Sequence, residues 1–209
     1  LTKNTSQLLT AIIENVFPKD YVISIQGGVD TATALLAQKW DYIFFTGSVP
    51  VGKIVAEAAA KNLTPVTLEL GGKSPCIIDA SVNLKLAAKR LVWGKFLNGG
   101  QTCIAPDYVI IKAEIKQLFI EILKTEITKA YGEHPKTSAD YPRIINKKNT
   151  LRLAELLKDV PVVFGGCVDE KENYIAPTLI DEPLLESAVM CEEIFGPILP
   201  ILTYETETD

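Results

Sequence analysis

The sequence has few of the residues that build metal centres or disulfide frameworks. It contains four cysteines, none of them in a CxxC spacing, and a single histidine, His134. A zinc site needs several Cys, His or carboxylate ligands at characteristic spacings, so neither a metal site nor a cysteine-stapled fold is expected. This cysteine content is typical of a reducing compartment, and we expect a cytoplasmic location.

Long apolar runs and excess positive charge are also missing. The longest apolar stretches, residues 108–111 and 194–202, are much shorter than the roughly 20 residues that span a bilayer. The formal net charge is −5, whereas a nucleic-acid-binding protein needs clustered basic side chains. We therefore expect no membrane segment in these residues and no nucleic-acid partner.

What is present is enough apolar sequence for a substantial core. The chain has 209 residues, of which 47% are hydrophobic, and this allows one large or two small globular domains. It starts at Leu1 on an amphipathic helical pattern, without the layout of a signal peptide, and its one methionine is Met190. We expect it to be a piece of a longer protein.

Hydrophobic periodicity predicts alternating helices and strands. Apolar residues recur at helical spacing before Pro18, over residues 51–62, from Leu84 to Val92 and over residues 115–127. Short apolar runs at residues 21–25, 42–45, 65–70, 75–78 and 107–112 predict strands. This alternation is typical of an α/β fold with a parallel sheet.

The first candidate binding loop is residues 47–53, GSVPVGK, between a predicted strand and a predicted helix. Free N–H groups at a helix start suit a phosphate or pyrophosphate, although Ser48 could equally be an ordinary helix cap. The stretch nearly matches the P-loop of nucleotide triphosphatases, but Ile54 stands where a hydroxyl must bind magnesium. A dinucleotide site is the stronger interpretation, and a triphosphate switch is the alternative.

Glu69 closes an apolar strand and is followed by Gly71 and Gly72. Ligands of α/β proteins bind at the carboxyl ends of strands. A carboxylate at such a place can serve as a general base, although most strand-end glutamates are simply solvated.

Cys103 follows Gly99 and Gly100, directly after a predicted helix. The glycines allow a tight turn that exposes the thiol and its backbone N–H, so Cys103 is the candidate nucleophile. The other three cysteines, Cys76, Cys167 and Cys191, are interpreted as inert core residues, because cysteine is usually buried. His134 lies in a polar linker, which argues against a Cys-His hydrolase.

The last candidate segment is residues 191–197, CEEIFGP. A carboxylate can accept hydrogen bonds from both hydroxyls of a ribose, and an aromatic ring can lie against a flat heterocycle. The alternative is a turn with an exposed acidic pair and a core phenylalanine.

Four ordered motifs, FTGS (45–48), ELGGKSP (69–75), GQTC (100–103) and EEIFGP (192–197), resemble the aldehyde dehydrogenase superfamily. The segments QTCIAPDY (101–108) and YIAPT (174–178) are similar to sequences of the class 3 branch, which acts on fatty and aromatic aldehydes. The likeness implies a Rossmann-like dinucleotide-binding domain, of which residues 1–70 would be the later half. It further implies that residues 71–209 are most of an α/β catalytic domain, with its C-terminal end missing.

The resemblance also implies a role for each site residue. Cys103 would attack the aldehyde, Glu69 would activate water against the thioester, and NAD or NADP would accept the hydride. The residues expected to line the pyrophosphate, the ribose and the nicotinamide are Gly47, Ser48, Val51, Gly52, Leu70, Glu193 and Phe195.

In the family, the second donor to the oxyanion is an asparagine upstream of the FTGS motif, and residues 1–209 do not include it. We therefore expect residues 1–209 alone to be nearly inactive, and the complete protein to be a homodimer. A folded protein with no ligand at all is the remaining alternative.

Overall fold

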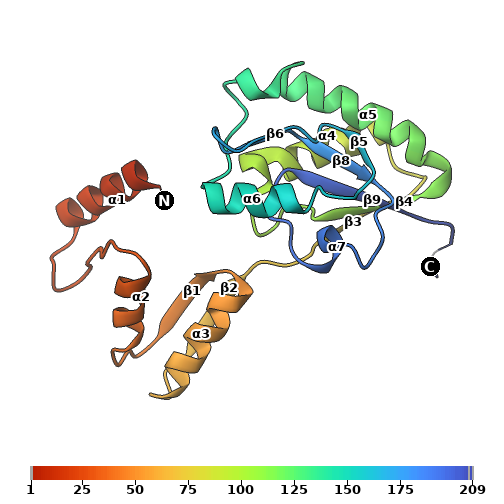
Figure 1. Cartoon of the computed structure of the whole chain (residues 1–209). Helices are drawn as coiled ribbons and strands as arrows, with labels where there is room; N and C mark the ends of the chain where they lie inside the picture. Colours follow the sequence, from red (N-terminus) through yellow and green to blue (C-terminus); the bar gives the residue numbers. More distant parts are fainter. Residues whose placement is uncertain (1, 207, 209) are drawn as a thin grey trace. The chain divides into compact units, whose positions relative to one another are not determined.

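The chain forms two compact units, Leu1–Leu70 and Gly71–Asp209 (Figure 1). The computed structural model describes residues 2–206 and 208. Helices alternate with mainly parallel strands in both units, which confirms the predicted α/β class. The assignment of the units to cofactor binding and catalysis stays a prediction.

The first unit is built around one parallel β-α-β segment. β1 (Ile43–Gly47) and β2 (Val66–Leu70) pair side by side, and α3 (Val49–Ala60) connects them. Two helices precede this segment, α1 (Lys3–Val16) and α2 (Val29–Leu36). Neither α1 nor α2 contains a buried residue, so the core of this unit is small.

The strand predicted over residues 21–25 is absent. The side chains there alternate between half-buried and exposed, as in a strand, but the segment has no regular secondary structure. A strand needs a neighbour that satisfies its backbone N–H and C=O groups. In the described part of this unit the sheet consists of β1 and β2 only, so the prediction was wrong because the pattern reports side-chain polarity and not pairing.

The second unit is centred on a five-stranded sheet. Its order is β3-β4-β9-β8-β5, and every neighbouring pair is parallel except β5 and β8. The elements of this unit are β3 (Pro75–Ile78), α4 (Leu84–Phe96), the 3₁₀ turn η1 (Leu97–Gly100), β4 (Tyr108–Lys112), α5 (Ala113–Tyr131), η2 (Pro135–Thr137), α6 (Lys147–Glu155), β5 (Val162–Phe164), the β6 (Val168–Asp169) and β7 (Tyr174–Ile175) pair, β8 (Thr178–Asp181), α7 (Ala188–Cys191) and β9 (Ile198–Tyr204).

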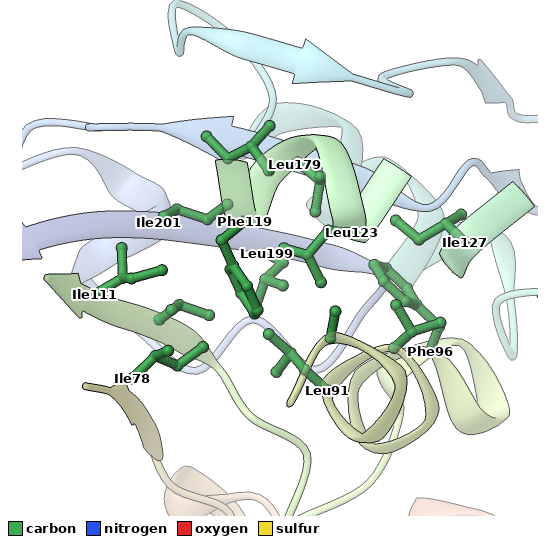
Figure 2. Packing of buried hydrophobic residues seen from close by; sticks show 14 residues of the cluster. Ile78, Leu91, Phe96, Ile111, Phe119, Leu123, Ile127, Leu179, Leu199 and Ile201 are labelled. Atoms are coloured by element: carbon green, nitrogen blue, oxygen red, sulfur yellow. The ribbon is translucent and has the colours of Figure 1, made fainter. Parts of the chain in front are cut away.

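Both faces of this sheet are covered by apolar side chains. Successive residues of a strand point to opposite faces, and in β9 Leu199 packs in one buried cluster while Ile198 packs in the other. Figure 2 shows the first cluster, in which Phe119 and Leu123 of α5 meet the side chains of the strands. Helices α4 and α5 thus cover one face of the sheet, and α6 and α7 pack on the other. This packing fixes the strands and the segments that lead into them.

None of the helices in residues 2–206 is both long enough and apolar enough to cross a membrane.

Candidate functional site

Three of the predicted site segments enter the second unit's sheet at one edge. Residues 71–74 lead into β3, residues 101–107 into β4 and residues 192–197 into β9. These strands are parallel neighbours, so their amino ends lie at the same edge. The Asp107 N–H donates to the Ser74 carbonyl at 2.8 Å and joins two of the segments directly.

Cys103 lies on an exposed turn, as predicted. After α4, Asn98, Gly99 and Gly100 all have positive φ, between 52° and 73°, and reverse the chain. A side chain at Gly100 would overlap the Gly196 carbonyl oxygen, so this position requires glycine for two reasons. Together these features place the Cys103 turn against the segment that carries Glu193.

The side chain of Gln101 fixes this turn to the rest of the unit. Its Nε2 donates to the carbonyls of Asn98 at 2.9 Å and Arg143 at 3.2 Å, and its Oε1 accepts from the Ile145 N–H at 2.9 Å. This role of Gln101 was not predicted from the sequence. An amide side chain beside a glycine turn was the available signal, because such a side chain can replace missing backbone partners.

Glu193 lies directly over the Gly71-Gly72 turn. Its Oε1 accepts from the Gly72 N–H at 3.2 Å, and a side chain at Gly71 would overlap its carboxylate. Burial raises the pKa of Glu193, while the Gly72 hydrogen bond acts in the opposite direction. The structure therefore brings together two motifs that are separated by more than one hundred residues.

Phe195 turns the chain just after Glu193. Its φ is +48°, in the left-handed region that non-glycine residues rarely adopt, and its side chain is 37% exposed. The next residue, Gly196, is packed so closely on Leu153 that a side chain there would overlap the leucine. The partly exposed ring is available to contact a flat ligand.

An ion pair between the half-buried Lys73 and the buried Asp107 lies next to these segments. Lys73 Nζ lies 2.5 Å from Asp107 Oδ2, and the Asp107 side chain is only 3% exposed. Asp107 Oδ1 accepts from the Ile194 N–H at 2.9 Å, and Lys73 Nζ also donates to the carbonyls of Val189 at 2.9 Å and Glu192 at 3.1 Å. Arg152 Nη2 donates to the Ile194 carbonyl at 2.7 Å.

A fully buried cation, Lys95, lies in the last turn of α4. It is 1% exposed, and burial lowers its pKa to about 8, while the charge of Asp107 raises it. Neither Lys95 nor the Lys73–Asp107 pair was identified from the sequence. In the sequence, a buried charged residue cannot be told from one whose side chain is in solvent.

The remaining predicted residues belong to the first unit. At its carboxyl edge Gly47 pairs with Leu70 and Thr46 pairs with Glu69. A side chain at Gly52 would lie 2.7 Å from Leu70, so Leu70 faces α3. Because successive residues alternate, Glu69 points to the opposite face, and it is exposed. Gly52 thus has a packing role that the sequence analysis did not predict.

The start of α3 presents free backbone donors. Ser48 occupies the cap position, but its side chain makes no capping hydrogen bond, and Pro50 lies in the first turn. Helix geometry leaves the N–H groups of the first turn, including those of Val49 and Val51, without helical partners. With the partial positive charge of a helix start, this arrangement suits a phosphate group.

The predicted burial of the other cysteines was wrong for two of them. Cys167 and Cys191 are exposed, and only Cys76 packs partly against the core. The exposed pair lies in a connection between strands and at the end of the four-residue helix α7, where few side chains are available to cover a thiol. All four cysteines are free. No group of metal-ligating side chains occurs within residues 2–206.

The structure therefore joins Gly71, Gly72, the Cys103 turn, Glu193 and Phe195 at one edge of the second unit. Glu69, Leu70 and the loop at residues 47–52 lie at the carboxyl edge of the first unit. The meeting of Glu69 with Cys103 stays a prediction.

Comparison with known proteins gives a consistent result over the whole chain. The model of the aldehyde dehydrogenase family matches residues 1–209. The chain is 48% identical over 208 residues to 4,4'-diaponeurosporen-aldehyde dehydrogenase of Staphylococcus aureus (strain NCTC 8325 / PS 47), covering 99% of this chain and 45% of that protein. It is also 48% identical over 203 residues to aldehyde dehydrogenase family 3 member A2 of Mus musculus, covering 97% and 42%.

A solved structure shows the same fold. The substrate-bound state of Staphylococcus aureus AldH superimposes with a TM-score of 0.93 at 47% identity, covering 98% of this chain and 45% of that one. The chain thus spans less than half the length of the relatives that it matches.

Proposed function

The chain belongs to the aldehyde dehydrogenase family, and from this premise we propose that the complete protein oxidises aldehydes to carboxylic acids with NAD or NADP. The observation that carries the proposal is the Cys103 turn. It presents an exposed thiol on a backbone that three left-handed residues and the Gly100–Gly196 contact hold against the Glu193 segment. A nucleophile needs this combination of access and fixed position.

The residues present fit a nicotinamide dinucleotide. The open start of α3 offers the N–H groups of Val49 and Val51 for the pyrophosphate, beside Gly47 and Ser48, while the N–H of Gly52 is bonded to the Ser48 carbonyl. The Glu193 carboxylate has one oxygen on the Gly72 N–H and is left with acceptor capacity for a ribose diol. The partly exposed ring of Phe195 and the side chain of Leu70, which packs near Gly52, would border the nicotinamide. When bound, NAD or NADP accepts the hydride.

In the proposed reaction the Cys103 sulfur, as a thiolate, adds to the aldehyde carbonyl and forms a thiohemiacetal. The Cys103 backbone N–H donates to the developing oxyanion, a kind of contact whose loss typically costs about 2.7–4 kcal/mol. Loss of hydride from this carbon leaves a thioester. Glu69 then takes a proton from water, the hydroxide attacks the thioester, and the acid and the free thiolate are released.

We propose that the substrates are apolar aldehydes. Ile104 follows the nucleophile directly and is 89% exposed, so an apolar chain bound to Cys103 would contact it and remove apolar surface from water. The resemblance to the class 3 branch, which acts on fatty and aromatic aldehydes, supports the same proposal, and one relative is named for 4,4'-diaponeurosporen-aldehyde. We further propose a cytoplasmic homodimer, and little activity for residues 1–209 expressed alone.

The test uses the complete natural protein that contains this chain. Aldehyde-dependent formation of NADH or NADPH is measured at 340 nm with a panel of aliphatic and aromatic aldehydes. Cys103→Ala is expected to abolish turnover, and Cys167→Ala is the matched control, because Cys167 is also exposed and free but lies outside the proposed site. Glu69→Gln should release one equivalent of reduced cofactor and then stall at the thioester.

Unchanged turnover in Cys103→Ala would refute the proposed nucleophile. Complete cycles in Glu69→Gln would refute Glu69 as the base while leaving the family chemistry intact.

A further inference from the structure

The backbone on both sides of Glu193 is held by cationic side chains from distant segments. Lys73, which precedes β3, donates to the Glu192 carbonyl at 3.1 Å. Arg152, on α6, donates to the Ile194 carbonyl at 2.7 Å. The residues that flank Glu193 are therefore each held by a charged donor, and charge-assisted hydrogen bonds are roughly twice as strong as neutral ones.

A third contact prevents this segment from rotating. Asp107 accepts from the Ile194 N–H at 2.9 Å, so the peptide groups before and after Ile194 are both anchored. Asp107 is in turn paired with Lys73 at 2.5 Å and almost fully buried. Since a buried carboxylate without its partner is costly, Lys73 and Asp107 stabilise each other in this position.

The segment needs such anchoring because of the residue that follows. Phe195 has a φ of +48°, and a left-handed conformation costs a non-glycine residue roughly 1–2 kcal/mol. Without its anchors, the segment could relax to an ordinary extended path. That change would move the Glu193 carboxylate and the Phe195 ring away from the Gly71-Gly72 turn.

We infer that Arg152 and Lys73, with Asp107 between them, are positioning residues that set the affinity for the dinucleotide by fixing the backbone around Glu193. The inference rests on the proposed function, in which Glu193 holds the cofactor's ribose. Neither cation touches substrate or cofactor in this scheme. Both act through the carbonyls of the neighbouring residues.

The charge of Arg152 also favours the ionised form of Glu193, which a ribose requires. Burial and the charge of Asp107 raise the pKa of Glu193 above its ordinary value, and the hydrogen bond from Gly72 and the charges of Arg152 and Lys95 offset part of that rise. A neutral donor in place of Arg152 could keep the hydrogen bond to Ile194 but would lose this effect.

The experiment compares Arg152→Met, Arg152→Lys and Lys73→Met with the wild type in the complete natural protein. Arg90→Met is the matched control, because it removes an exposed arginine of α4. The first readouts are the dissociation constant of NADH or NADPH, from nucleotide fluorescence, and KM for each substrate. The third is the amount of reactive Cys103, from iodoacetamide labelling.

For Arg152→Met we expect the dissociation constant and KM of the cofactor to rise about 10-fold, the free-energy equivalent of one charge-assisted hydrogen bond. Aldehyde KM at saturating cofactor should stay within about 2-fold, and Cys103 labelling should be unchanged. Arg152→Lys, which keeps the charge and a donor, should recover most of the cofactor affinity. Lys73→Met should show the same pattern if it folds.

A merely structural role would give the opposite pattern, with less labelled Cys103, lower kcat and unchanged KM for the cofactor. That result in Arg152→Met would overturn the inference, and so would cofactor affinity that Arg152→Lys fails to restore. A wild type without any aldehyde-dependent reduction of cofactor would instead refute the proposed function. The two failures are therefore distinguishable.

Discussion

At Gly100, the addition of a single methyl group should lower both the stability of the fold and the reactivity of Cys103. The φ of Gly100 is +73°, and an added Cβ would overlap the Gly196 carbonyl. We expect Gly100→Ala to lower the free energy of unfolding by more than the about 1–3 kcal/mol that a strained conformation costs, and to reduce Cys103 labelling. Urea denaturation and iodoacetamide kinetics measure these two effects.

Gly99→Ala separates the two causes. Gly99 lies in the same turn with a similar φ of +62°, but an added Cβ would make only van der Waals contacts, the nearest 3.4 Å from Pro142. It should therefore show the conformational cost alone, with Cys103 labelling unchanged. Equal losses of stability in the two variants would mean that the Gly196 contact contributes nothing.

Lys95 should make stability depend on pH in the alkaline range. Burial lowers its pKa to about 8 from 10.5, so between these values the unfolded chain binds more protons than the folded one. The free energy of unfolding of the wild type should therefore rise with pH across this window, relative to Lys95→Met. The rise should reach about 3 kcal/mol, from about 1.4 kcal/mol per pKa unit.

Urea titrations of both proteins at pH 7.5, 9 and 10.5 provide the measurement. Because the two proteins share all other titrating groups, only the difference between them counts. A difference that stays constant over the three pH values would show that Lys95 is not a buried cation.

For single residues, the sequence predicted the local backbone better than the contacts between distant segments. The glycines before Cys103 indicated a turn, and the turn is present with its thiol exposed. Asp107, Lys73 and Arg152 could not be identified, because their roles depend on contacts between segments that are remote in the chain. The buried state of Lys95 was hidden for the same reason, since composition does not reveal which side of a helix the sheet covers.

Among the elements, α5 tests the packing of the second unit most directly. Phe119 is fully buried under the sheet, whereas its neighbour Leu118 is 58% exposed. Phe119→Ala should lower the free energy of unfolding by about 3–5 kcal/mol through lost burial and a cavity. Leu118→Ala should change it by less than about 0.5 kcal/mol, as is usual for surface positions.

Urea denaturation of the two variants and the wild type measures both values. Similar losses at the two positions would contradict the face of α5 that packs on the sheet.

Helices and buried strands were predicted because their signal is local. The apolar spacing of residues 115–127 predicted the helix that α5 forms, and the run at residues 107–112 predicted β4. Residues 21–25 carry an equally good strand pattern, yet β pairing depends on a neighbour that no local pattern specifies. The same limit applies to the place of β9 between β4 and β8, because β4 and β9 are far apart in sequence.

For the molecule as a whole, the two units should differ in their ability to fold alone. The second unit buries two extensive apolar clusters, whereas the first buries few side chains. We expect residues 71–209 to unfold cooperatively in urea, and residues 1–70 to show little structure by circular dichroism. A cooperative transition in residues 1–70 would mean that the β-α-β segment is sufficient for folding.

The contact between Gly71 and Glu193 should make substitutions at these two positions depend on each other. The backbone at Gly71 does not have positive φ, so the carboxylate of Glu193 is what excludes a side chain there. In a lineage in which position 71 acquires an alanine, the Glu193 carboxylate would have to move off the Gly72 N–H, be shortened to aspartate or be lost. Substitutions at these two sites should therefore be correlated across descendants, with neither site drifting alone.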